Sequence, residues 1–479
     1  MKKRFLKRSA AITLTAVMAA SLAGCGNGGK DSQTAAQTKE QAVSQPVSGE
    51  TTAQGETGAE EKAVQEKASG EAASGEPVTV SFWMAAASEE RNAFMEEIFE
   101  KFHEQNPDIT VEYLGVPGDV AQFNQKVDMA LAGNEAPDII QGTLTAGYIT
   151  RGIPARLDEM YANSELKDRI DEKYTDAFRV ADYVNGNLYA VPGPMNIQMI
   201  YTRPDYIEEA GLEAYKTWDD FFNIAEKTTK ADEGIFGYII RGGSGGAEAL
   251  EKLMYSYSGI TEYFVDGVCT LNDPKNVEFV EKYLGGYKKF SSADDLNKSW
   301  TEMSSQFQSG KAAMLVHNTG SGQANLDAFE GDQTKVAACP YPASTYTGKI
   351  TVPDATLNGY MITESSKNKE AAWKVIEYLE SPEIAGGYAK LTGQIPAPSD
   401  AQSQAWIQES PYMKVASDYI NDANTVMTHT PAYLPNYTTI RNDYAQPAMQ
   451  EVMLGMTTAQ EFLDEWARLL QEDYDELMK

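Results

Sequence analysis

A glycine-rich segment of the sequence has the spacing of a hydrolase nucleophile. Gly242-Gly243-Ser244-Gly245-Gly246 satisfies G-x-S-x-G, and it follows an apolar stretch at residues 235–240. In α/β-hydrolases a strand–turn–helix context of this kind presents the serine for attack on an ester or amide. His317 and several aspartates follow in the order that such enzymes use. Any cluster of glycines around a serine matches the pattern, however, and no HGGG-like oxyanion segment precedes it. A secreted serine hydrolase is therefore one alternative interpretation.

Other catalytic chemistries have less support. The three histidines, His103, His317 and His429, are scattered along the chain, whereas zinc sites cluster their ligands. No calcium loop of the EF-hand type is present, and no spacing among the 70 acidic residues indicates a glycosidase pair. We expect no metal, no cofactor and no catalytic residue. Cys269 and Cys339 could pair outside the cell or remain buried thiols.

The charge balance excludes some partners. The 479 residues include 40 Lys and Arg against 70 Asp and Glu, a formal net charge of −30. Nucleic-acid binding needs a basic surface, so nucleic acid is not expected as a partner. The length suggests two to three domains, at about 150 residues each.

The N-terminal region predicts a lipoprotein leader and a tether. Residues 1–24 combine five basic residues with an apolar run that is too short to span a membrane. Leu22-Ala23-Gly24-Cys25 resembles the lipobox of bacterial lipoproteins, which implies that Cys25 is lipidated and becomes the new N-terminus. Removal of this leader would change the net charge from −30 to −35. Residues 26–76 lack aromatic residues, Leu, Ile and Met, which predicts a flexible tether.

Apolar periodicity indicates an α/β body that begins near Val78. Residues 78–82 and 109–113 alternate as strands do, and an apolar stripe at residues 94–102 is typical of an amphipathic helix. A helix closed by Gly133 and a short strand at 137–140 follow, and this order implies parallel pairing. Further strands are expected at residues 189–191, 199–201, 235–240, 312–316 and 360–363, and further helices after Thr217, Ser381 and Thr458.

Short motifs occur in a recognisable order over nearly all of residues 77–479. They include residues 78–83, Asn106-Pro107-Asp108-Ile109, residues 130–139, Gly186-Asn187-Leu188-Tyr189-Ala190-Val191-Pro192, Thr217-Trp218-Asp219-Asp220-Phe221, and residues 307–314 and 361–379. Each motif is weak alone. Together they resemble the extracellular solute-binding proteins of bacterial ABC importers, the sugar-binding group that includes maltose-binding protein.

The resemblance implies a two-lobed, periplasmic-binding-protein-like α/β fold with a hinge and a central ligand cleft. It assigns residues 77–195 and 350–400 to the first lobe, and residues 198–348 and 401–479 to the second. A ligand would shift such a molecule from open to closed through its better fit to the closed form.

The residues expected to contact the ligand lie at strand ends and lobe crossings. Tryptophan can stack on a sugar ring, and amides can donate to and accept from hydroxyls. Structural roles, such as core packing for Trp83 or a satisfied histidine at position 317, are the alternatives. Tyr433 and Tyr437 could complete a wall or only pack the surface. The predicted ligand-binding residues are Trp83, Gln141, Gly142, Thr143, Met195, Asn196, Arg241, His317, Asn318, Asn358, Gly359, Tyr360 and Arg441.

The function implied is that of a monomeric lipoprotein on the extracellular face of the cell membrane. It would capture a neutral carbohydrate by hinge closure and deliver it to the permease subunits of an ABC transporter. The acidic surface disfavours an anionic ligand, although Arg241 or Arg441 could reverse this inside the cleft. A peptide or a polyol is the alternative ligand.

Overall fold

The computed structural model describes residues 77–479 apart from residues 86, 118–119 and 354–357. The described residues belong to one unit, Ala72–Lys479. The predicted leader, the lipidation site at Cys25 and the tether lie outside the described residues.

A five-stranded sheet, in the order β2-β1-β3-β12-β4, forms the centre of the first lobe. Its strands are β1 (Val78–Met84), β2 (Ile109–Gly115), β3 (Ile139–Thr143), β4 (Val191–Pro192) and β12 (Asn358–Ile362). β1 runs parallel to both β2 and β3, which confirms the predicted pairing, whereas β12 is antiparallel to β3 and β4. Late in the sequence, β12 therefore returns to the sheet that the N-terminal strands begin.

Helices cover the first sheet with the faces that the sequence predicts. α1 (Glu89–Gln105) buries Met95, Ile98, Phe99 and Phe102, the predicted apolar stripe, and packs against β2. α13 (Lys369–Leu379) packs against β1 and β12. The other helices whose neighbours in sequence belong to this lobe are α2 (Val120–Ala132), α3 (Ala146–Thr150), α4 (Asp158–Asn163), α5 (Leu166–Arg169), α6 (Glu172–Arg179) and α14 (Pro382–Thr392).

A four-stranded sheet, in the order β10-β5-β9-β6, forms the centre of the second lobe. Its strands are β5 (Gln198–Thr202), β6 (Phe236–Tyr238), β9 (Ala312–Asn318) and β10 (Ala337–Cys339). β6 and β9 are parallel, so their carboxyl ends lie at the same edge. Two further strand pairs are β7 (Phe264–Val265) with β8 (Val268–Cys269), and β11 (Ile350–Pro353) with β13 (Thr425–Thr428).

The remaining helices surround the second sheet and continue to the C-terminus. They are α7 (Pro204–Glu209), α8 (Trp218–Thr228), η1 (Ala231–Glu233), α9 (Gly246–Ser258), α10 (Pro274–Leu284), η2 (Ala293–Asn297), α11 (Trp300–Gln308), η3 (Thr319–Ser321), α12 (Gly322–Asp327), α15 (Ser399–Gln402), α16 (Ala405–Glu409), α17 (Pro411–Ile420), α18 (Tyr437–Ile440), the π-helical turn η4 (Arg441–Ala445), α19 (Gln446–Met453) and α20 (Ala459–Leu477). Capping boxes are present at Thr217 and Thr458, where the sequence predicts that helices begin.

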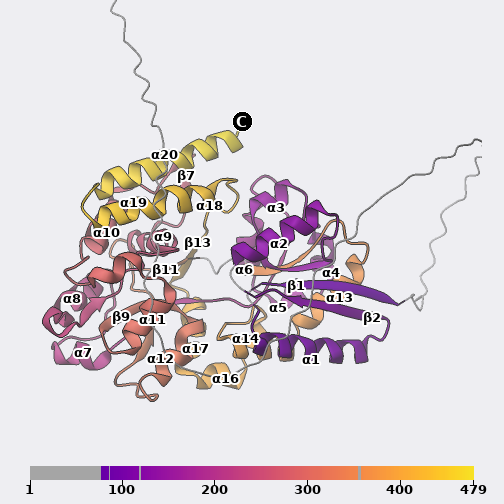
Figure 1. The fold of residues 1–479 in the computed structure, drawn as a ribbon, viewed down its shortest axis with the longest axis horizontal. Helices are drawn as coiled ribbons and strands as arrows, with labels where there is room; N and C mark the ends of the chain where they lie inside the picture. The colour runs from indigo at the N-terminus through magenta and orange to yellow at the C-terminus, as the bar shows by residue number, and fades with distance from the viewer. Residues whose placement is uncertain (1–76, 86, 118–119, 354–357) are drawn as a thin grey trace, which may run out of the picture. The chain divides into compact units, whose positions relative to one another are not determined.

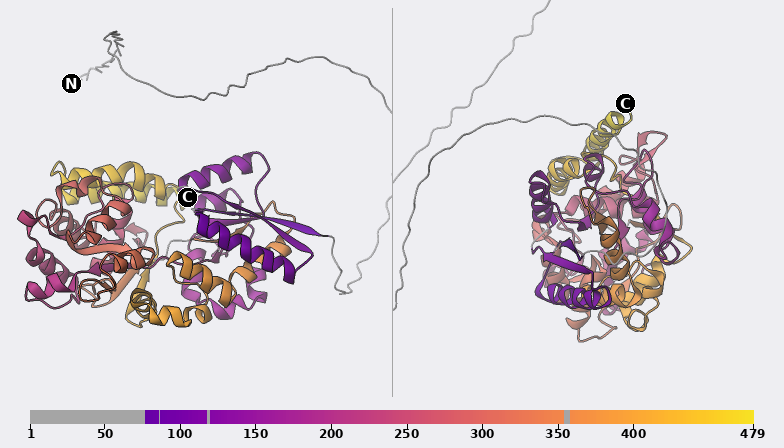
Figure 2. Two further views of the ribbon diagram at one scale, coloured as in Figure 1. Left: turned by 60° about the horizontal axis from the view of Figure 1, so that its bottom comes forward. Right: turned by 90° about the vertical axis from the view of Figure 1, so that its right-hand side faces the viewer.

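The chain passes between the two sheets more than once. Figure 1 shows β1, β2, α1 and α13 on one side, and β9, α8, α11 and α12 on the other. The C-terminal helices α19 and α20 lie with the second group, and Figure 2 shows the same grouping from a second direction. The exact lobe boundaries stay a prediction.

One strand is shorter than the sequence predicts. The apolar run at residues 235–240 forms only β6, Phe236–Tyr238. The N–H of Ile240 donates to Oδ2 of Asp295, at 2.8 Å, so it has left the strand ladder. Similarly, of residues 189–191 only Val191 pairs, as part of β4. At β6 a side chain distant in sequence takes the backbone N–H that would continue the strand, which an apolar pattern cannot show.

Candidate functional site

One cavity lies at the carboxyl ends of two parallel strands of the first sheet. Gln141, Gly142 and Thr143 end β3, and Ala85 follows β1. Ligands of open α/β sheets bind beyond the carboxyl ends of the strands. The cavity has a volume of about 260 Å³, and its lining also includes Arg91, Pro194, Asn196, Asn358, Tyr388 and Gln394. The structure thus brings Gln141, Gly142, Thr143, Asn196 and Asn358, all predicted ligand-binding residues, to one cavity.

Two amides are paired in the wall of this cavity. Gln141 is 4% exposed, and its Nε2 donates to Oδ1 of Asn358 at 3.3 Å. An amide offers two N–H donors and a carbonyl acceptor, more than this single bond uses. The pair can therefore hold its own orientation and still bind hydroxyl groups.

Two neighbouring residues have structural roles. A Cβ added at Gly359 would overlap the carbonyl oxygen of Val191, so glycine is required for β12 to approach β4. Tyr360 is 5% exposed, and its ring centroid lies 6.3 Å from that of Phe82 in the core. Neither Gly359 nor Tyr360 is among the lining residues of this cavity.

A second cavity is lined by residues of both lobes. Its volume is about 290 Å³, and it shares Thr143 with the first cavity. Its first-lobe wall is formed by residues 143–147, at the end of β3 and the start of α3. The facing wall includes Glu248 and Lys252 on α9, Tyr437 and Thr438 on α18, and Arg441 at the start of η4. Of the predicted residues, Arg441 thus faces the β3 end from the other lobe.

The facing wall carries a buried charge network. Arg441 Nη1 lies 3.1 Å from Oε1 of Glu251, and Lys252 Nζ lies 2.8 Å from Oε1 of Glu248. Tyr437 Oη donates to the same Glu251 oxygen at 2.6 Å. Lys252 and then Arg441 lower the pKa of Glu248 to about 2, against the effect of burial. Burial raises the pKa of Glu251. These contacts hold Arg441 rigidly at the cavity.

A guanidinium and two rings form a cluster at the carboxyl edge of β6 and β9. The Cζ atom of Arg241 lies 4.1 Å from the ring centroid of Trp300, and the Trp300 and His317 ring centroids are 4.3 Å apart. His317 is 8% exposed, and burial, together with the positive charge of Arg241, lowers its pKa to about 4. The histidine is therefore neutral at neutral pH.

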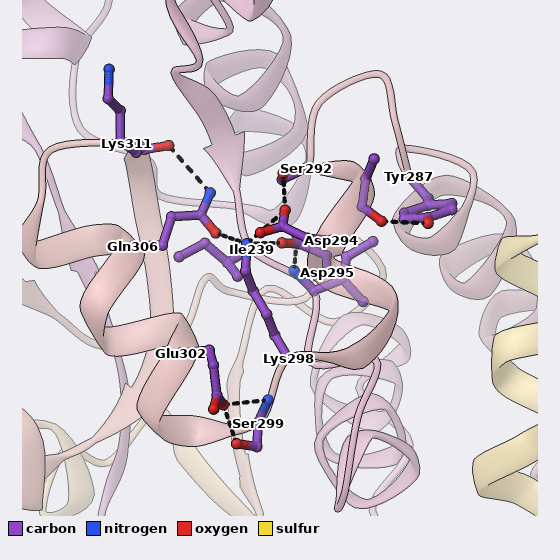
Figure 3. Close-up of polar contacts among 12 residues, drawn as sticks. Ile239, Tyr287, Ser292, Asp294, Asp295, Lys298, Ser299, Glu302, Gln306 and Lys311 are labelled. Atoms are coloured by element: carbon purple, nitrogen blue, oxygen red, sulfur yellow. Dashed lines mark hydrogen bonds and ion pairs between the residues drawn. The ribbon is translucent and has the colours of Figure 1, made fainter. Parts of the chain in front are cut away.

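A buried ion pair fixes the segments that carry Arg241 and Trp300. Lys298 Nζ lies 2.8 Å from Oδ1 of Asp295, and Asp295 also accepts the N–H of Ile240. Lys298 further contacts Gln306 of α11, as Figure 3 shows. Because Ile240 precedes Arg241 and Lys298 lies just before Trp300, this pair joins the two segments. Burial raises the pKa of Asp295 to about 6.

The other predicted residues lie elsewhere. Trp83 is half-buried on β1, with Lys126 Nζ 5.1 Å from its ring centroid. Met195 is 4% exposed, bridges Ile395 and lines a small separate cavity. Asn318 uses its side chain to accept the N–H of Gly320 at 3.0 Å, which caps η3. None of the three is among the residues that line the two cavities above.

The G-x-S-x-G segment has a structural explanation. The N–H groups of Gly242 and Gly243 donate to the carbonyl oxygens of Asp295 and Lys298, and Gly245 has a φ of 75° as the N-cap of α9. Ser244 is exposed, whereas His317 is buried, and no hydrogen bond among the described residues joins Ser244 to a histidine. The glycines therefore serve a tight turn.

Several residues of the site were not predicted from the sequence. In the sequence, Glu248 and Lys252 resemble ordinary charged residues on the surface of a helix, and Trp300 does not follow a predicted strand. A signal for Trp300 did exist, because Ser299 and Glu302 have capping-box spacing around it and do form that cap. That spacing locates Trp300 at a helix N-terminus.

A third cavity, of about 640 Å³, shares no lining residue with the other two but also has walls from both predicted lobes, with Tyr183 on one side and Tyr263 on the other. Tyr183 and Tyr433 line it, and their rings stack at a centroid distance of 4.4 Å. Tyr433 therefore packs against Tyr183, while Tyr437 lines the second cavity.

In the described part of the chain, no group of His, Cys, Asp and Glu side chains is arranged to hold a metal ion. Among the described helices, none has the length and apolar character needed to span a bilayer. Cys269 and Cys339 are free thiols, and burial raises the pKa of Cys269 to about 11.

Comparison with known proteins identifies the family to which this chain is similar. The family model for bacterial extracellular solute-binding proteins matches residues 86–386. The galactooligosaccharide-binding protein of Bacillus subtilis is 23% identical over 382 residues, 77% of this chain and 83% of that protein. The mannitol-binding protein of Pseudomonas aeruginosa is 21% identical over 339 residues, 67% of this chain and 74% of that protein.

A solved structure supports the fold. The ABC substrate-binding protein of Listeria monocytogenes in complex with cycloalternan superimposes with a TM-score of 0.63 at 19% identity, and the match covers 84% of this chain and 98% of that chain. The predicted two-lobed fold is thereby confirmed. The matching family consists of binding proteins rather than enzymes, so the hydrolase alternative is wrong and the prediction of no catalytic role is confirmed. The chain belongs to the family of bacterial extracellular solute-binding proteins.

Proposed function

We propose that this protein captures a carbohydrate in the cleft that its two adjoining cavities line, and that it delivers the sugar to the permease of an ABC importer. The observation that supports this most is the group of amides, Gln141, Asn196 and Asn358, at the carboxyl ends of the first-sheet strands. Sugar hydroxyls both donate and accept, and amides match both roles. The relatives above are named for galactooligosaccharides and mannitol, which are also rich in hydroxyls.

Capture would couple binding to closure of the lobes. The second cavity already has walls from both lobes, so a ligand held there contacts both. A ligand shifts an open–closed equilibrium only by the difference in its affinity for the two states. Contacts with both walls at once supply that difference, and the closed form would be the one that the permease recognises.

Thermal unfolding against a sugar panel tests the ligand class. A ligand at 1,000 times its Kd stabilises the folded state by roughly 4 kcal/mol. We expect at least one mono- or oligosaccharide to raise the unfolding temperature in a dose-dependent way. Absence of a shift with every sugar and polyol would contradict the proposal. Mannitol belongs in the panel, because a polyol-binding relative is known.

Single substitutions test the site. Asn196→Ala and Asn358→Ala each remove an amide from the first cavity, and each should weaken sugar binding about tenfold, the equivalent of one hydrogen bond of roughly 1.4 kcal/mol. Asn223→Ala is the matched control, because Asn223 is exposed on α8. Equal affinities for all four proteins, measured by calorimetry, would place the sugar elsewhere.

We further propose that Cys25 anchors the protein to the extracellular face of the cell membrane. The support is the leader and lipobox of the sequence. Lipidation with two or more acyl chains gives stable attachment, whereas one chain is marginal. Expressed in a bacterium, the protein should incorporate labelled palmitate and fractionate with membranes. Cys25→Ala should abolish both, with Cys339→Ala as the control cysteine.

A further inference from the structure

Arg241 is a half-buried cation without an ionic partner. No carboxylate of a described residue lies within ion-pairing distance of it, although acidic residues greatly outnumber basic ones in the chain. Its Nε is buried and has no hydrogen-bond partner among the described residues. Burial lowers the pKa of Arg241 to about 10; the charge of Glu248 opposes this, and the nearby Arg441 acts in the same direction as burial. A cation that is desolvated with only partial compensation carries an energetic cost.

Both faces of this guanidinium are covered. The Trp300 ring lies on it at 4.1 Å, and Gly245 approaches so closely that an added Cβ would overlap the guanidinium. These contacts position the group and leave its two Nη atoms, rather than the buried Nε, for recognition. A fixed, planar fork of donors matches a carboxylate in bidentate geometry.

Arg241 and the charges around it sum to a positive value. His317, whose ring centroid lies 4.3 Å from that of Trp300, is buried and neutral at neutral pH, so it neither adds to nor offsets the charge of Arg241. Glu248, the nearest acidic influence on Arg241, is already shared by Lys252 and Arg441. One additional negative charge would therefore be compensated here.

We propose that Arg241 binds the carboxylate of an acidic sugar, so that the ligand is an oligosaccharide containing a hexuronic acid residue. This rests on the proposed carbohydrate function and narrows it. The acidic surface of the protein favours a neutral ligand, whereas this proposal gives the ligand one negatively charged group, the carboxylate.

A carboxylate fits better than a phosphate. His317 is neutral at neutral pH, so it adds no charge to that of Arg241, and a monoanion needs only one cation. A phosphate ester carries close to two negative charges at neutral pH. The single guanidinium matches the charge of a uronate.

Matched pairs of oligosaccharides test the inference. The purified protein is titrated calorimetrically with oligosaccharides that contain a hexuronate, with the corresponding neutral oligosaccharides of the gluco, galacto and manno series, with the single hexuronates and hexoses, and with hexose phosphates. We expect at least one hexuronate to bind 100-fold or more tightly than its neutral partner. Arg241→Gln should reduce that ratio below tenfold, Arg241→Lys should give an intermediate ratio, and Arg468→Gln, an exposed control on α20, should leave it unchanged.

The outcomes separate this inference from the function on which it rests. Tight binding by neutral sugars alone, or a preference for hexose phosphates, would overturn the uronate assignment and leave carbohydrate capture intact. Failure of every saccharide to bind would contradict both. Arg241→Gln must also show an unchanged unfolding temperature without ligand. If Arg241→Gln does not fold, the ratio of hexuronate affinity to neutral-sugar affinity measured for Arg241→Lys decides.

Discussion

The two walls of the cleft differ in how they present polar groups. On the first-lobe side, amides and backbone groups end the strands of a sheet, and Gln141 and Asn358 hold one another. On the second-lobe side, Arg441, Lys252 and Glu248 line the second cavity with charges, and Arg241 lies nearby against Trp300. Amides suit hydroxyl groups of many sugars, whereas a fixed guanidinium discriminates by charge. Under the proposed function, the first wall would give general affinity and the second wall would give specificity.

The largest expected effect is on stability, through the buried charges of the second-lobe wall. Arg441→Ala would leave Glu251, which is 0% exposed, without its cation. Removing one partner of a buried ion pair typically costs about 3–5 kcal/mol of unfolding free energy. Urea denaturation measures this loss. Arg468→Ala, which breaks exposed pairs on α20, should cost less than about 1 kcal/mol. Similar losses for both variants would show that the wall is not held by its buried charges.

The next largest effect concerns the first-lobe wall, which depends on close backbone packing. Gly359→Ala places a Cβ against the carbonyl oxygen of Val191. Overpacking of this kind costs about 1–3 kcal/mol. Gly147→Ala is the control, since its added Cβ would meet only Thr145 Oγ1, at 3.7 Å. If denaturation shows Gly359→Ala to be as stable as the control, the strands of this wall can separate.

A third prediction concerns how the unfolding free energy depends on pH through a buried group of the first lobe and two buried groups of the second. Burial raises the pKa of Glu380, at the end of α13, to about 8 from 4.5. Between these values the folded state binds more protons than the unfolded state, so stability falls as pH rises. In the second lobe the raised pKa of Asp295 lowers stability with rising pH only up to about 6, and the lowered pKa of His317 acts oppositely between about 4 and 6.5. Among these groups, Glu380 alone acts above pH 6.5.

The measurement is the unfolding free energy between pH 6.5 and 8. It should fall by about 1 kcal/mol per pH unit, close to the limit for one proton. Glu380→Gln should remove this slope, while Glu383→Gln, on the exposed surface of α14, should retain it. An unchanged slope in Glu380→Gln would assign the titration to another group.

The smallest expected effect is at the third cavity, which shares no lining residue with the other two. Tyr183 is 47% exposed and stacks on Tyr433. Tyr183→Ala should cost about 1 kcal/mol or less in unfolding free energy, the usual value of an aromatic pair. Sugar affinity should stay within twofold of the parent, because Tyr183 lines neither of the two cavities at the strand ends. A tenfold change in affinity would make this cavity part of the binding cleft.

Much of the fold could be predicted because it follows from local sequence patterns. The alternation at residues 78–82, the stripe of α1 and the caps at Thr217 and Thr458 all have short-range causes. The early end of β6 could not be predicted, because the side chain that takes the Ile240 N–H belongs to Asp295, 55 residues further along.

The site was predictable where it follows from strand ends and not where it follows from packing between distant segments. Gln141, Thr143, Asn196 and Asn358 lie near strand ends, and the structure brings them to one cavity. Glu248, Lys252 and Trp300 carry no such mark, because their positions depend on how α9 and α11 pack.

The sequence by itself determined the family, the α/β class and the charge of the surface, because composition, periodicity and motif order are properties of the chain. Only the tertiary structure decided which of the predicted ligand-binding residues lie close together. It placed Tyr360 in the core and Arg441 in a buried ion pair, and it set Arg241 between Trp300 and Gly245. The physical reason is that desolvation and the balance of charge depend on neighbours that are close in space and distant in sequence.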